Sequence, residues 1–345
     1  MTTSIEWTNK VWNPLAGCTP VSPGCVNCYA ARMAMRLEGM GTKGYQPVEP
    51  TVDEIAARHA AGVNTLPSID KRIRIAEVRG GRPVFTGSVR MIPDKLTDPL
   101  HWRAPKMIFV NSMSDLFHEA VPFDFIDQVF AVMALCPQHT FQVLTKRPER
   151  MAEYTGDHKV AARIWDACIA MNDEVVRTVH RTIDTSNLDH QVVVWPLPNV
   201  WLGTSVEDQE RANQRIPHLL KCPAAVRFLS CEPLLGMVDL SAFFGGPYVG
   251  LPGDVVHPNY NFGINWVIAG GESGAKSRPC NIEWIRSIVQ QCKAAAVPCF
   301  VKQLGAKPMV SENEVLETYT QKGNDPIYWP EDLRVREMPA GTTRE

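Results

Sequence analysis

Long hydrophobic runs are missing from this sequence. Among its 345 residues, no apolar stretch approaches the roughly 20 residues that a membrane-spanning helix needs. The first residues, 1–7, also lack the basic segment and the apolar run of a secretory signal. We therefore expect a soluble, cytoplasmic protein with no membrane partner, in which thiols stay reduced.

The sequence also lacks an excess of charge of either sign. Lys and Arg total 35, Asp and Glu total 37, and the formal net charge is −2. Because the net charge is close to zero, any binding of nucleic acid would have to depend on local basic segments. One such segment lies between Lys71 and Arg82, and it fits either a nucleic-acid backbone or a solvated face. Internal repeats and low-complexity tracts are absent as well.

Three cysteines gather in one short loop near the start of the chain. Cys18, Cys25 and Cys28 have the spacing Cys-x6-Cys-x2-Cys, with two prolines and a glycine in the first gap. In a reducing compartment this cluster favours a metal or cluster site over disulfides. A closed zinc site takes four ligands, whereas a [4Fe–4S] cluster held by three thiolates keeps one iron open. We interpret Cys136, Cys168, Cys222, Cys292 and Cys299 as ordinary buried residues.

The residues around these cysteines resemble a known motif. Residues 12–18 (Trp-Asn-Pro-Leu-Ala-Gly-Cys) and 24–30 (Gly-Cys-Val-Asn-Cys-Tyr-Ala) resemble the cluster loop of radical S-adenosylmethionine (SAM) enzymes. They resemble more closely a related group of phage and bacterial three-cysteine-motif proteins of unassigned activity. The broad superfamily usually has a shorter first gap and an aromatic residue just before the last cysteine, where this chain has Asn27.

The resemblance implies an enzyme with two cofactors. Cys18, Cys25 and Cys28 would hold a [4Fe–4S] cluster, and SAM would bind its open iron. One electron from a donor such as a flavodoxin or ferredoxin would cleave SAM and start hydrogen abstraction from a substrate. The phage-linked resemblance and the local basic residues point toward a nucleobase, nucleotide or nucleic acid as substrate.

Short apolar segments alternate with helical patterns along most of the chain. Seven of them fall at 11–12, 108–110, 141–144, 200–202, 226–229, 266–269 and 299–301. Such strands predict a parallel sheet covered by helices. Because the strands end in polar residues, we predict an α/β fold: a parallel (β/α) barrel of the TIM or radical SAM type, full or partly open. An open doubly wound sheet is the alternative, and 89–92 is a candidate eighth strand.

The barrel is predicted to span residues 1–305, with the iron–sulfur loop at 12–30. Loop and helical insertions interrupt it at about 39–82, 157–198 and 239–263, with helices expected near 52–61 and 159–179. Residues 306–345 show weak periodicity and are predicted to form a C-terminal appendage. Long loops on a barrel either shape the substrate pocket or are tolerated insertions.

Polar residues at the predicted strand ends are candidate ligands. SAM needs an acceptor for its ammonium, polar partners for its ribose and glycines where backbone comes close. Candidate cofactor-binding residues are Ser112, Ser114 and Asp115 for the ammonium, Thr204, Ser205 and Glu207 for the ribose, Glu232, and the late Gly270, Gly271 and Glu272, which resemble the glycine-glycine-acid motif of the superfamily. Candidate substrate-binding residues are Lys146, Arg147 and Lys302, which suit a carboxylate or phosphate. Each set could instead cap helices or form turns.

Two other functions fit the same residues. Three thiolates with a histidine or carboxylate could bind zinc in a hydrolytic or nucleotide-processing barrel. Alternatively, the cysteine loop could be a structural metal site on a non-catalytic nucleic-acid-binding protein. His118 and Glu119 form a candidate acid/base pair, with a surface histidine at a helix start as the simpler interpretation.

Overall fold

The computed structural model describes residues 3, 5–48, 73–179, 193–245, 263–274 and 276–340. The helix expected near 52–61 and the first residues of the basic segment, Lys71 and Arg72, lie outside these ranges. So do large parts of the three predicted insertions.

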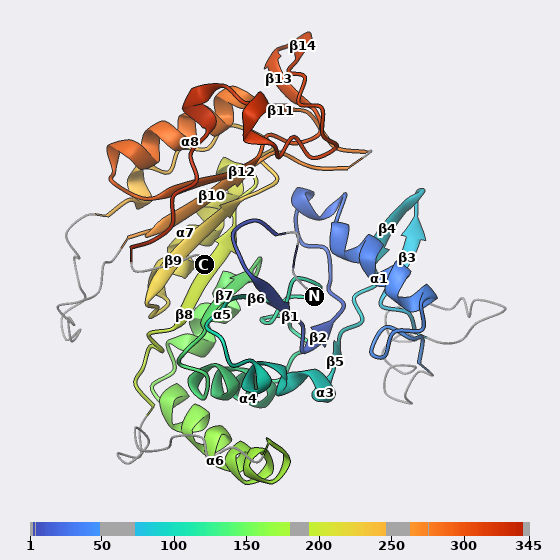
Figure 1. Cartoon of the computed structure of the whole chain (residues 1–345), viewed down its shortest axis with the longest axis vertical. Coiled ribbons are helices and arrows are strands. Elements are labelled where there is room, and N and C mark those ends of the chain that lie inside the picture. Colours follow the sequence, from blue (N-terminus) through green and yellow to red (C-terminus); the bar gives the residue numbers. More distant parts are fainter. Residues whose placement is uncertain are drawn as a thin grey trace.

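A parallel sheet of seven strands forms the centre of the molecule (Figure 1). Its strands, in spatial order, are β1 (Lys10–Trp12), β6 (Met107–Val110), β7 (Thr140–Thr145), β8 (Val200–Ser205), β9 (Val226–Cys231), β10 (Trp266–Gly270) and β12 (Cys299–Gln303). Every neighbouring pair is parallel. The seven predicted strands and the parallel sheet are therefore confirmed.

The sheet curls into a half-barrel and does not close (Figure 1). In the described residues β1 and β12 are its two edges and do not pair with each other. The spatial order follows the chain order without reversal, so the doubly wound alternative, which needs a switch in strand order, is wrong. The candidate eighth strand at 89–92 is wrong too. There β5 (Arg90–Met91) pairs antiparallel with β2 (Leu15–Ala16), outside the main sheet.

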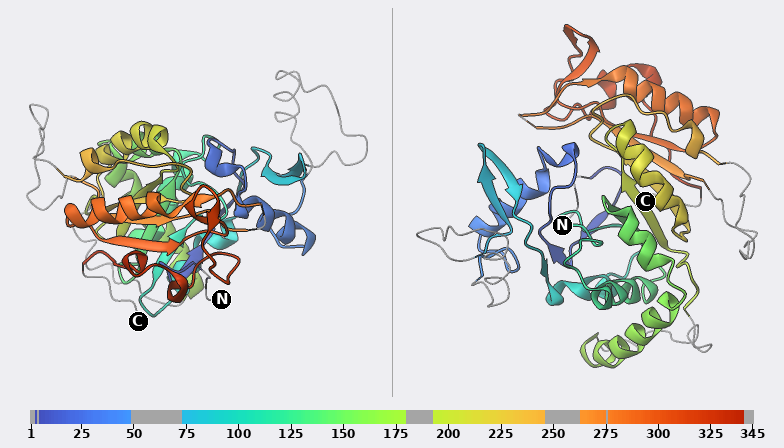
Figure 2. Two further views of the ribbon diagram at one scale, coloured as in Figure 1. Left: turned by 90° about the horizontal axis from the view of Figure 1, so that it is seen from above. Right: turned by 180° about the vertical axis from the view of Figure 1, so that it is seen from behind.

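Helices cover the convex face of the sheet (Figure 2). They are α4 (Phe123–Ala134), α5 (Pro148–Thr155), α6 (Val160–Val179), α7 (Gln209–Lys221) and α8 (Ile282–Ala294), with the short α3 (Pro93–Leu96) before β6. Alternate strand side chains, such as Phe141 and Val143 of β7, pack against these helices in the main core. None of the described helices is long and apolar enough to cross a membrane.

The opposite set of strand side chains fills the inside of the curl. This inner core contains Trp7, Met107, Phe109, Trp201, Phe228, Trp266, Ile268 and Phe300. Its aromatic rings meet at angles, as in the Trp7–Phe109 pair with centroids 4.7 Å apart. The inner core closes the amino-terminal end of the half-barrel, so the open space lies at the carboxyl ends of the strands.

Two smaller parts flank the half-barrel. On one side lie α1 (Tyr29–Gly39) and the hairpin of β3 (Ala76–Arg79) and β4 (Arg82–Phe85). On the other, β13 (Pro308–Ser311) joins β11 (Cys280–Asn281) and β14 (Glu314–Val315). Figures 1 and 2 place α1 and the hairpin together, away from α4 to α8.

The segment after residue 305 packs against the edge of the sheet. The Val301 amide donates to the Val335 carbonyl, and the Glu337 amide donates to the Cys299 carbonyl, each at 2.8 Å. Trp329 is buried in the main core behind this contact. The segment predicted as an appendage thus covers the edge of β12, where backbone groups would otherwise be exposed.

The packing of the inner core can be tested at Gly203 in β8. A Cβ there would lie 2.6 Å from the ring of Phe228, which is fully buried. We expect Gly203→Ala to lower the free energy of unfolding by about 1–3 kcal/mol, as overpacked cores do. Urea denaturation measures the change. Gly236→Ala is the matched control, because nothing lies within 4 Å of its Cβ position. Equal unfolding midpoints for the two variants would contradict this account.

Candidate functional site

A cavity of about 260 Å³ opens at the carboxyl ends of the strands. The rings of Trp7 and Phe109 contribute to its wall. Most of the predicted site residues line it: Cys18, Cys25, Cys28, Ser112, Ser114, Asp115, Lys146, Arg147, Ser205, Glu232, Gly271, Glu272 and Lys302. Thr204, Glu207 and Gly270 do not. The structure therefore brings the cysteine loop and the strand ends to one place.

The three cysteines are free thiols in half-buried positions on the cavity wall. Burial raises the pKa of Cys18 to about 12 and also raises the pKa of Cys28. Nowhere in the described chain do three His, Cys, Asp or Glu side chains converge as they do around a single metal ion.

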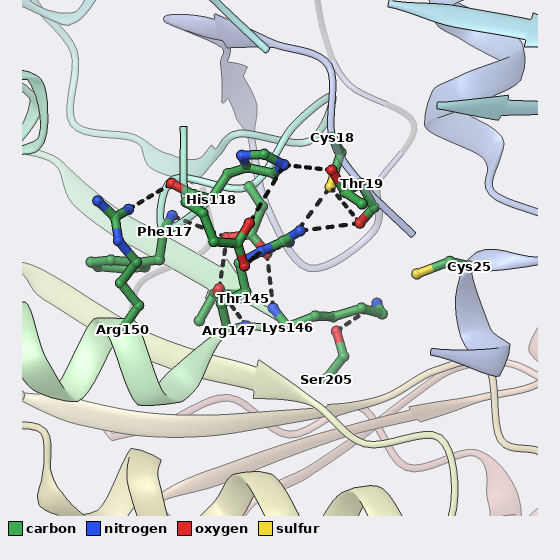
Figure 3. Close-up of polar contacts among 12 residues, drawn as sticks. Cys18, Thr19, Cys25, Phe117, His118, Thr145, Lys146, Arg147, Arg150 and Ser205 are labelled. Carbon is green, nitrogen blue, oxygen red and sulfur yellow. Dashed lines mark hydrogen bonds and ion pairs between the residues drawn. The ribbon is translucent and has the colours of Figure 1, made fainter. Parts of the chain in front are cut away.

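Arg147, directly after β7, holds the start of the cysteine loop (Figure 3). Its Nη2 donates to the Thr19 carbonyl at 3.1 Å, and its Nη1 lies 3.7 Å from Cys18 Sγ. The same guanidinium pairs with Asp115 at 3.1 Å and Glu119 at 2.8 Å. The donors of this buried side chain are committed to the protein, so its role is to position the loop.

Asp115 is similarly committed. One carboxylate oxygen accepts from the Thr145 hydroxyl at 2.6 Å and the Phe117 amide at 3.0 Å. The other accepts from the Lys146 amide at 3.0 Å and from Arg147. Asp115 is 5% exposed, and these bonds join the ends of β6 and β7. No obvious capacity remains for the SAM ammonium that the sequence assigned to it.

His118 adds a further contact to the loop (Figure 3). The Ala120 amide donates to its Nδ1, which leaves Nε2 to carry the proton in the neutral ring and to donate to the Thr19 hydroxyl at 2.7 Å. Burial and the nearby Arg147 lower the pKa of His118, so the neutral form is favoured. At 4% exposed, His118 is not a surface residue.

Glu207, after β8, holds the middle of the loop. It is completely buried and accepts from the Ser22 hydroxyl at 2.6 Å and from Arg215 at 2.8 Å. A Cβ on Gly24 would lie 2.4 Å from its carboxylate, so only glycine fits at that loop position. Burial raises the pKa of this carboxyl, but Lys146 and Arg215 outweigh that effect and the pKa is lowered. Glu207 is thus an ionised anchor for the loop.

Glu272, after β10, holds the end of the loop. Asn27 donates to its Oε2 at 2.9 Å, and Arg278 pairs with its Oε1 at 2.6 Å. Arg278 also donates to the Pro23 carbonyl at 2.9 Å. Burial raises the pKa of Glu272, but the hydrogen bonds from Arg278 and Asn27 outweigh it and the pKa lies below its usual value. Asn27 therefore has a structural partner in Glu272.

Other predicted residues are also used inside the protein. The Ser112 hydroxyl donates to Asn13 Oδ1, and the Ser114 hydroxyl donates to the Leu15 carbonyl, which tie β6 to the segment after β1. Thr204 is buried, and its hydroxyl donates to the Thr145 carbonyl.

The two glycines after β10 permit close backbone packing. A Cβ on Gly270 would lie 2.9 Å from the Gln303 carbonyl oxygen, and one on Gly271 would lie 2.3 Å from that of Leu304. These glycines are required because the ends of β10 and β12 approach each other.

A smaller set of polar groups faces the cavity with capacity to spare. Lys302 pairs with both oxygens of Glu232, at 2.7 and 2.8 Å. Lys146 donates to the Ser205 hydroxyl at 3.0 Å and points away from the Arg147 cluster (Figure 3). The side chains of Lys146, Lys302 and Glu232 are between 16% and 24% exposed, unlike those of Arg147, Glu207 and Glu272. These residues can contact a bound molecule.

Asn111 is a site residue that sequence reasoning missed. It lines the cavity, is 3% exposed, and neither polar atom of its amide has a hydrogen-bond partner. Its φ of 62° is a left-handed conformation that asparagine tolerates better than most residues. An unpaired buried polar group costs about 1–3 kcal/mol, so Asn111 is a candidate ligand for whatever fills the cavity. The available signal was an asparagine directly after a buried strand.

Comparison with known proteins identifies a family but no activity. Residues 2–327 match the family described as "Protein of unknown function (DUF5131)". The chain belongs to this family. No curated protein and no solved structure matches the chain.

The Glu272 anchor gives a pH-dependent prediction. The pKa of Glu272 is lowered from 4.5 in the folded state, so its ion pair stabilises the fold above that pH and is lost as the pH falls through the lowered value. We expect Glu272→Gln to lower the free energy of unfolding by about 1–3 kcal/mol near neutral pH and by less near pH 3.

Urea denaturation at the two pH values measures the Glu272 effect. Glu312→Gln, at an exposed position, is the control and should change little at either pH. A loss for Glu272→Gln that is the same at both pH values would show that the ion pair is not its cause.

Proposed function

We propose that this member of the DUF5131 family is a radical SAM-type enzyme built on an incomplete (β/α) barrel. The observation that carries the proposal is the placement of Cys18, Cys25 and Cys28. One loop brings three free thiols to the wall of a cavity at the carboxyl ends of seven parallel strands. Active sites of parallel barrels lie at that end.

The donor set fits a [4Fe–4S] cluster. Each thiolate in such a cluster binds a different iron, so a cluster can be held by three cysteines that do not converge on one point. A single metal ion would require them to converge. Arg147 is placed within reach of Cys18 Sγ, and hydrogen bonds to cluster sulfurs tune reduction potential. The anchors Arg147, Glu207 and Glu272 keep the loop in place independently of any bound metal.

When bound, the cluster and SAM would supply one-electron cleavage of the sulfonium and hydrogen-atom abstraction from a substrate. An external electron donor such as a flavodoxin or ferredoxin would deliver the electron. The protein's own contribution is placement and exclusion of water. Trp7 and Phe109 give the cavity an apolar wall, which limits water near a reactive species.

Glu232 is the carboxylate best suited to the cationic part of SAM. Asp115, Glu207 and Glu272 accept several hydrogen bonds from the protein and serve as anchors. Glu232 lines the cavity, and among the described residues its charged partner is Lys302 alone. The unpaired amide of Asn111 offers a further donor and acceptor in the same space. We therefore assign these two residues to ligand binding.

The cysteine assignment predicts iron content. Cys18→Ala, Cys25→Ala and Cys28→Ala should each abolish iron loading after anaerobic reconstitution, because each removes one cluster ligand. Iron and zinc analysis measures the metal, and electron paramagnetic resonance of the reduced wild type with and without SAM tests the open iron.

Cys168→Ala is the control for iron loading. Cys168 is buried between α6 and α4, where its thiol contacts the Ala131 carbonyl, so its loss should leave the iron unchanged. Equal iron in all four variants would refute the assignment. Zinc without iron in the wild type, even after reconstitution, would replace it with the zinc-dependent or structural alternative.

The Glu232 assignment predicts SAM affinity. Glu232→Gln should weaken SAM binding about tenfold, because one charge-assisted hydrogen bond is replaced by a neutral one. Anaerobic calorimetry on the reconstituted protein measures the affinity, and iron content should not change. The control is Glu314→Gln in the exposed β14. Unchanged affinity in Glu232→Gln would return the ammonium to Ser112 and Ser114.

A further inference from the structure

Helix α1 presents an unusual face to solvent. Its buried side consists of three alanines, Ala30, Ala31 and Ala34. The outer side carries Tyr29 and Met33, which are 52% and 37% exposed, and two exposed arginines. The helix begins directly after Cys28, so this face starts at the mouth of the cavity and leads away from it.

The arginines of this face are not neutralised by the protein. Arg32 and Arg36 lie one turn apart, and no ion pair joins either to an acidic side chain in the described residues. The acidic residues nearby are already paired, Glu38 with Arg74 at 3.3 Å and Glu77 with Arg79. Positive charge is therefore in excess along the helix.

Two further cations extend the same surface. Lys276 donates to the carbonyl of Gly81 at 2.8 Å, which places it against the turn where Arg82 begins β4. A Cβ on Gly274 would lie 3.4 Å from the Arg32 guanidinium, so the segment carrying Lys276 also touches α1. Arg82 and Lys276 are exposed. We call Arg32, Arg36, Arg82 and Lys276 the basic ridge.

Tyr29 connects the basic ridge to the cavity. Its ring is half-exposed and lines the cavity, while its hydroxyl donates to the Ser112 carbonyl at 2.9 Å. That hydrogen bond fixes the ring in one orientation, as a flat apolar surface beside the opening. Phe85, at the end of β4, lines the cavity on the hairpin side. An aromatic surface next to unpaired cations is the combination that binds single-stranded nucleic acid.

We infer that the basic ridge binds the backbone of single-stranded nucleic acid, with a base stacked on Tyr29 at the mouth of the cavity. As a statement about the substrate, this inference rests on the proposed function, and it makes a nucleotide within a strand the reacting group. Enzymes that act on a base take it out of the helix stack, and a cavity next to a backbone track provides for that. Binding itself does not depend on the cluster.

Fluorescence anisotropy with a labelled single-stranded DNA or RNA oligonucleotide tests the inference on the full-length protein. Affinity should fall with salt, and the double variant Arg32→Ala/Arg36→Ala should weaken binding on the order of tenfold at low salt. The slope of log K against log[salt] should also decrease by about 1.4, because each phosphate contact on a single strand contributes about 0.7.

The control removes two positive charges elsewhere. Arg103 and Lys159 are exposed and lie outside the cavity lining, so Arg103→Ala/Lys159→Ala should bind as the wild type does. Tyr29→Phe should retain most of the affinity, because the ring remains although the hydrogen bond that orients it is lost. Tyr29→Leu should weaken binding about fivefold or more, since stacking on an aromatic ring is worth about 1–3 kcal/mol per base.

The outcomes separate this inference from the proposed function. Iron content and the SAM-dependent spectrum should be unchanged in Arg32→Ala/Arg36→Ala, because neither arginine lines the cavity. If the wild type binds the oligonucleotide but loads no iron, the radical mechanism is refuted and the inference about the basic ridge stands. The inference is overturned if the wild type has no affinity for the oligonucleotide at low salt, or if the ridge and control variants lose affinity equally. In that case an acidic protein partner becomes the candidate for the α1 face.

Discussion

The cysteine loop depends on buried charges at the ends of the strands. Arg147, Glu207 and Glu272 follow β7, β8 and β10, and each contacts a different part of the loop. The loop's own backbone bonds form one short turn at Pro23–Cys25, with the Cys25 amide donating to the Ser22 carbonyl at 2.9 Å, and they do not fix the shape of the whole loop. The sheet supplies that shape instead, because parallel strands deliver their polar ends to one edge. The three thiols are therefore held on the cavity wall by the protein itself.

Strand-end residues therefore divide into two groups. Those in the first group, such as Asp115 and Glu207, are nearly or fully buried, and their oxygens accept bonds from the protein. Those in the second group, Glu232 and Lys302, face the cavity and are paired mainly with each other. The division matters for mutagenesis, because changes in the first group act through the loop and changes in the second alter the cavity lining directly. The effect of a substitution can therefore be interpreted only once its residue has been assigned to one of the two groups.

The sequence predicted the sheet well because buried parallel strands leave a local signal. Seven short apolar segments between helices were enough to give the strands and the direction of the sheet. The prediction of an eighth sheet strand at 89–92 was wrong because these residues form a two-residue antiparallel pairing with β2. The periodicity of a sequence does not show which strand a segment pairs with. The extended backbone of Val335–Glu337 beside β12 was missed for the same reason, since its partner strand decides its conformation.

The site was predictable in position but not in role. Most candidate residues line one cavity, because a residue after a parallel strand must lie at that edge. Which partner each side chain meets depends on the path of the cysteine loop, and that path is set by contacts far apart in sequence. Arg147 was assigned to substrate and Glu272 to SAM, yet both bond to the loop. The unpaired amide of Asn111 could be recognised only once its surroundings were known.

The separation along the chain between the loop and its anchors has a consequence for assembly. Ser22 meets Glu207 across 185 residues, Asn27 meets Glu272 across 245, and Pro23 meets Arg278 across 255. The ribosome thus makes the cysteines early and their supports late. Arg147 and His118 can hold the start of the loop earlier, but its middle and end lack their partners until the second half of the chain has emerged and folded. During that time the thiols are more open to oxidation. The cysteine loop accordingly reaches its final shape late, once the sheet is complete.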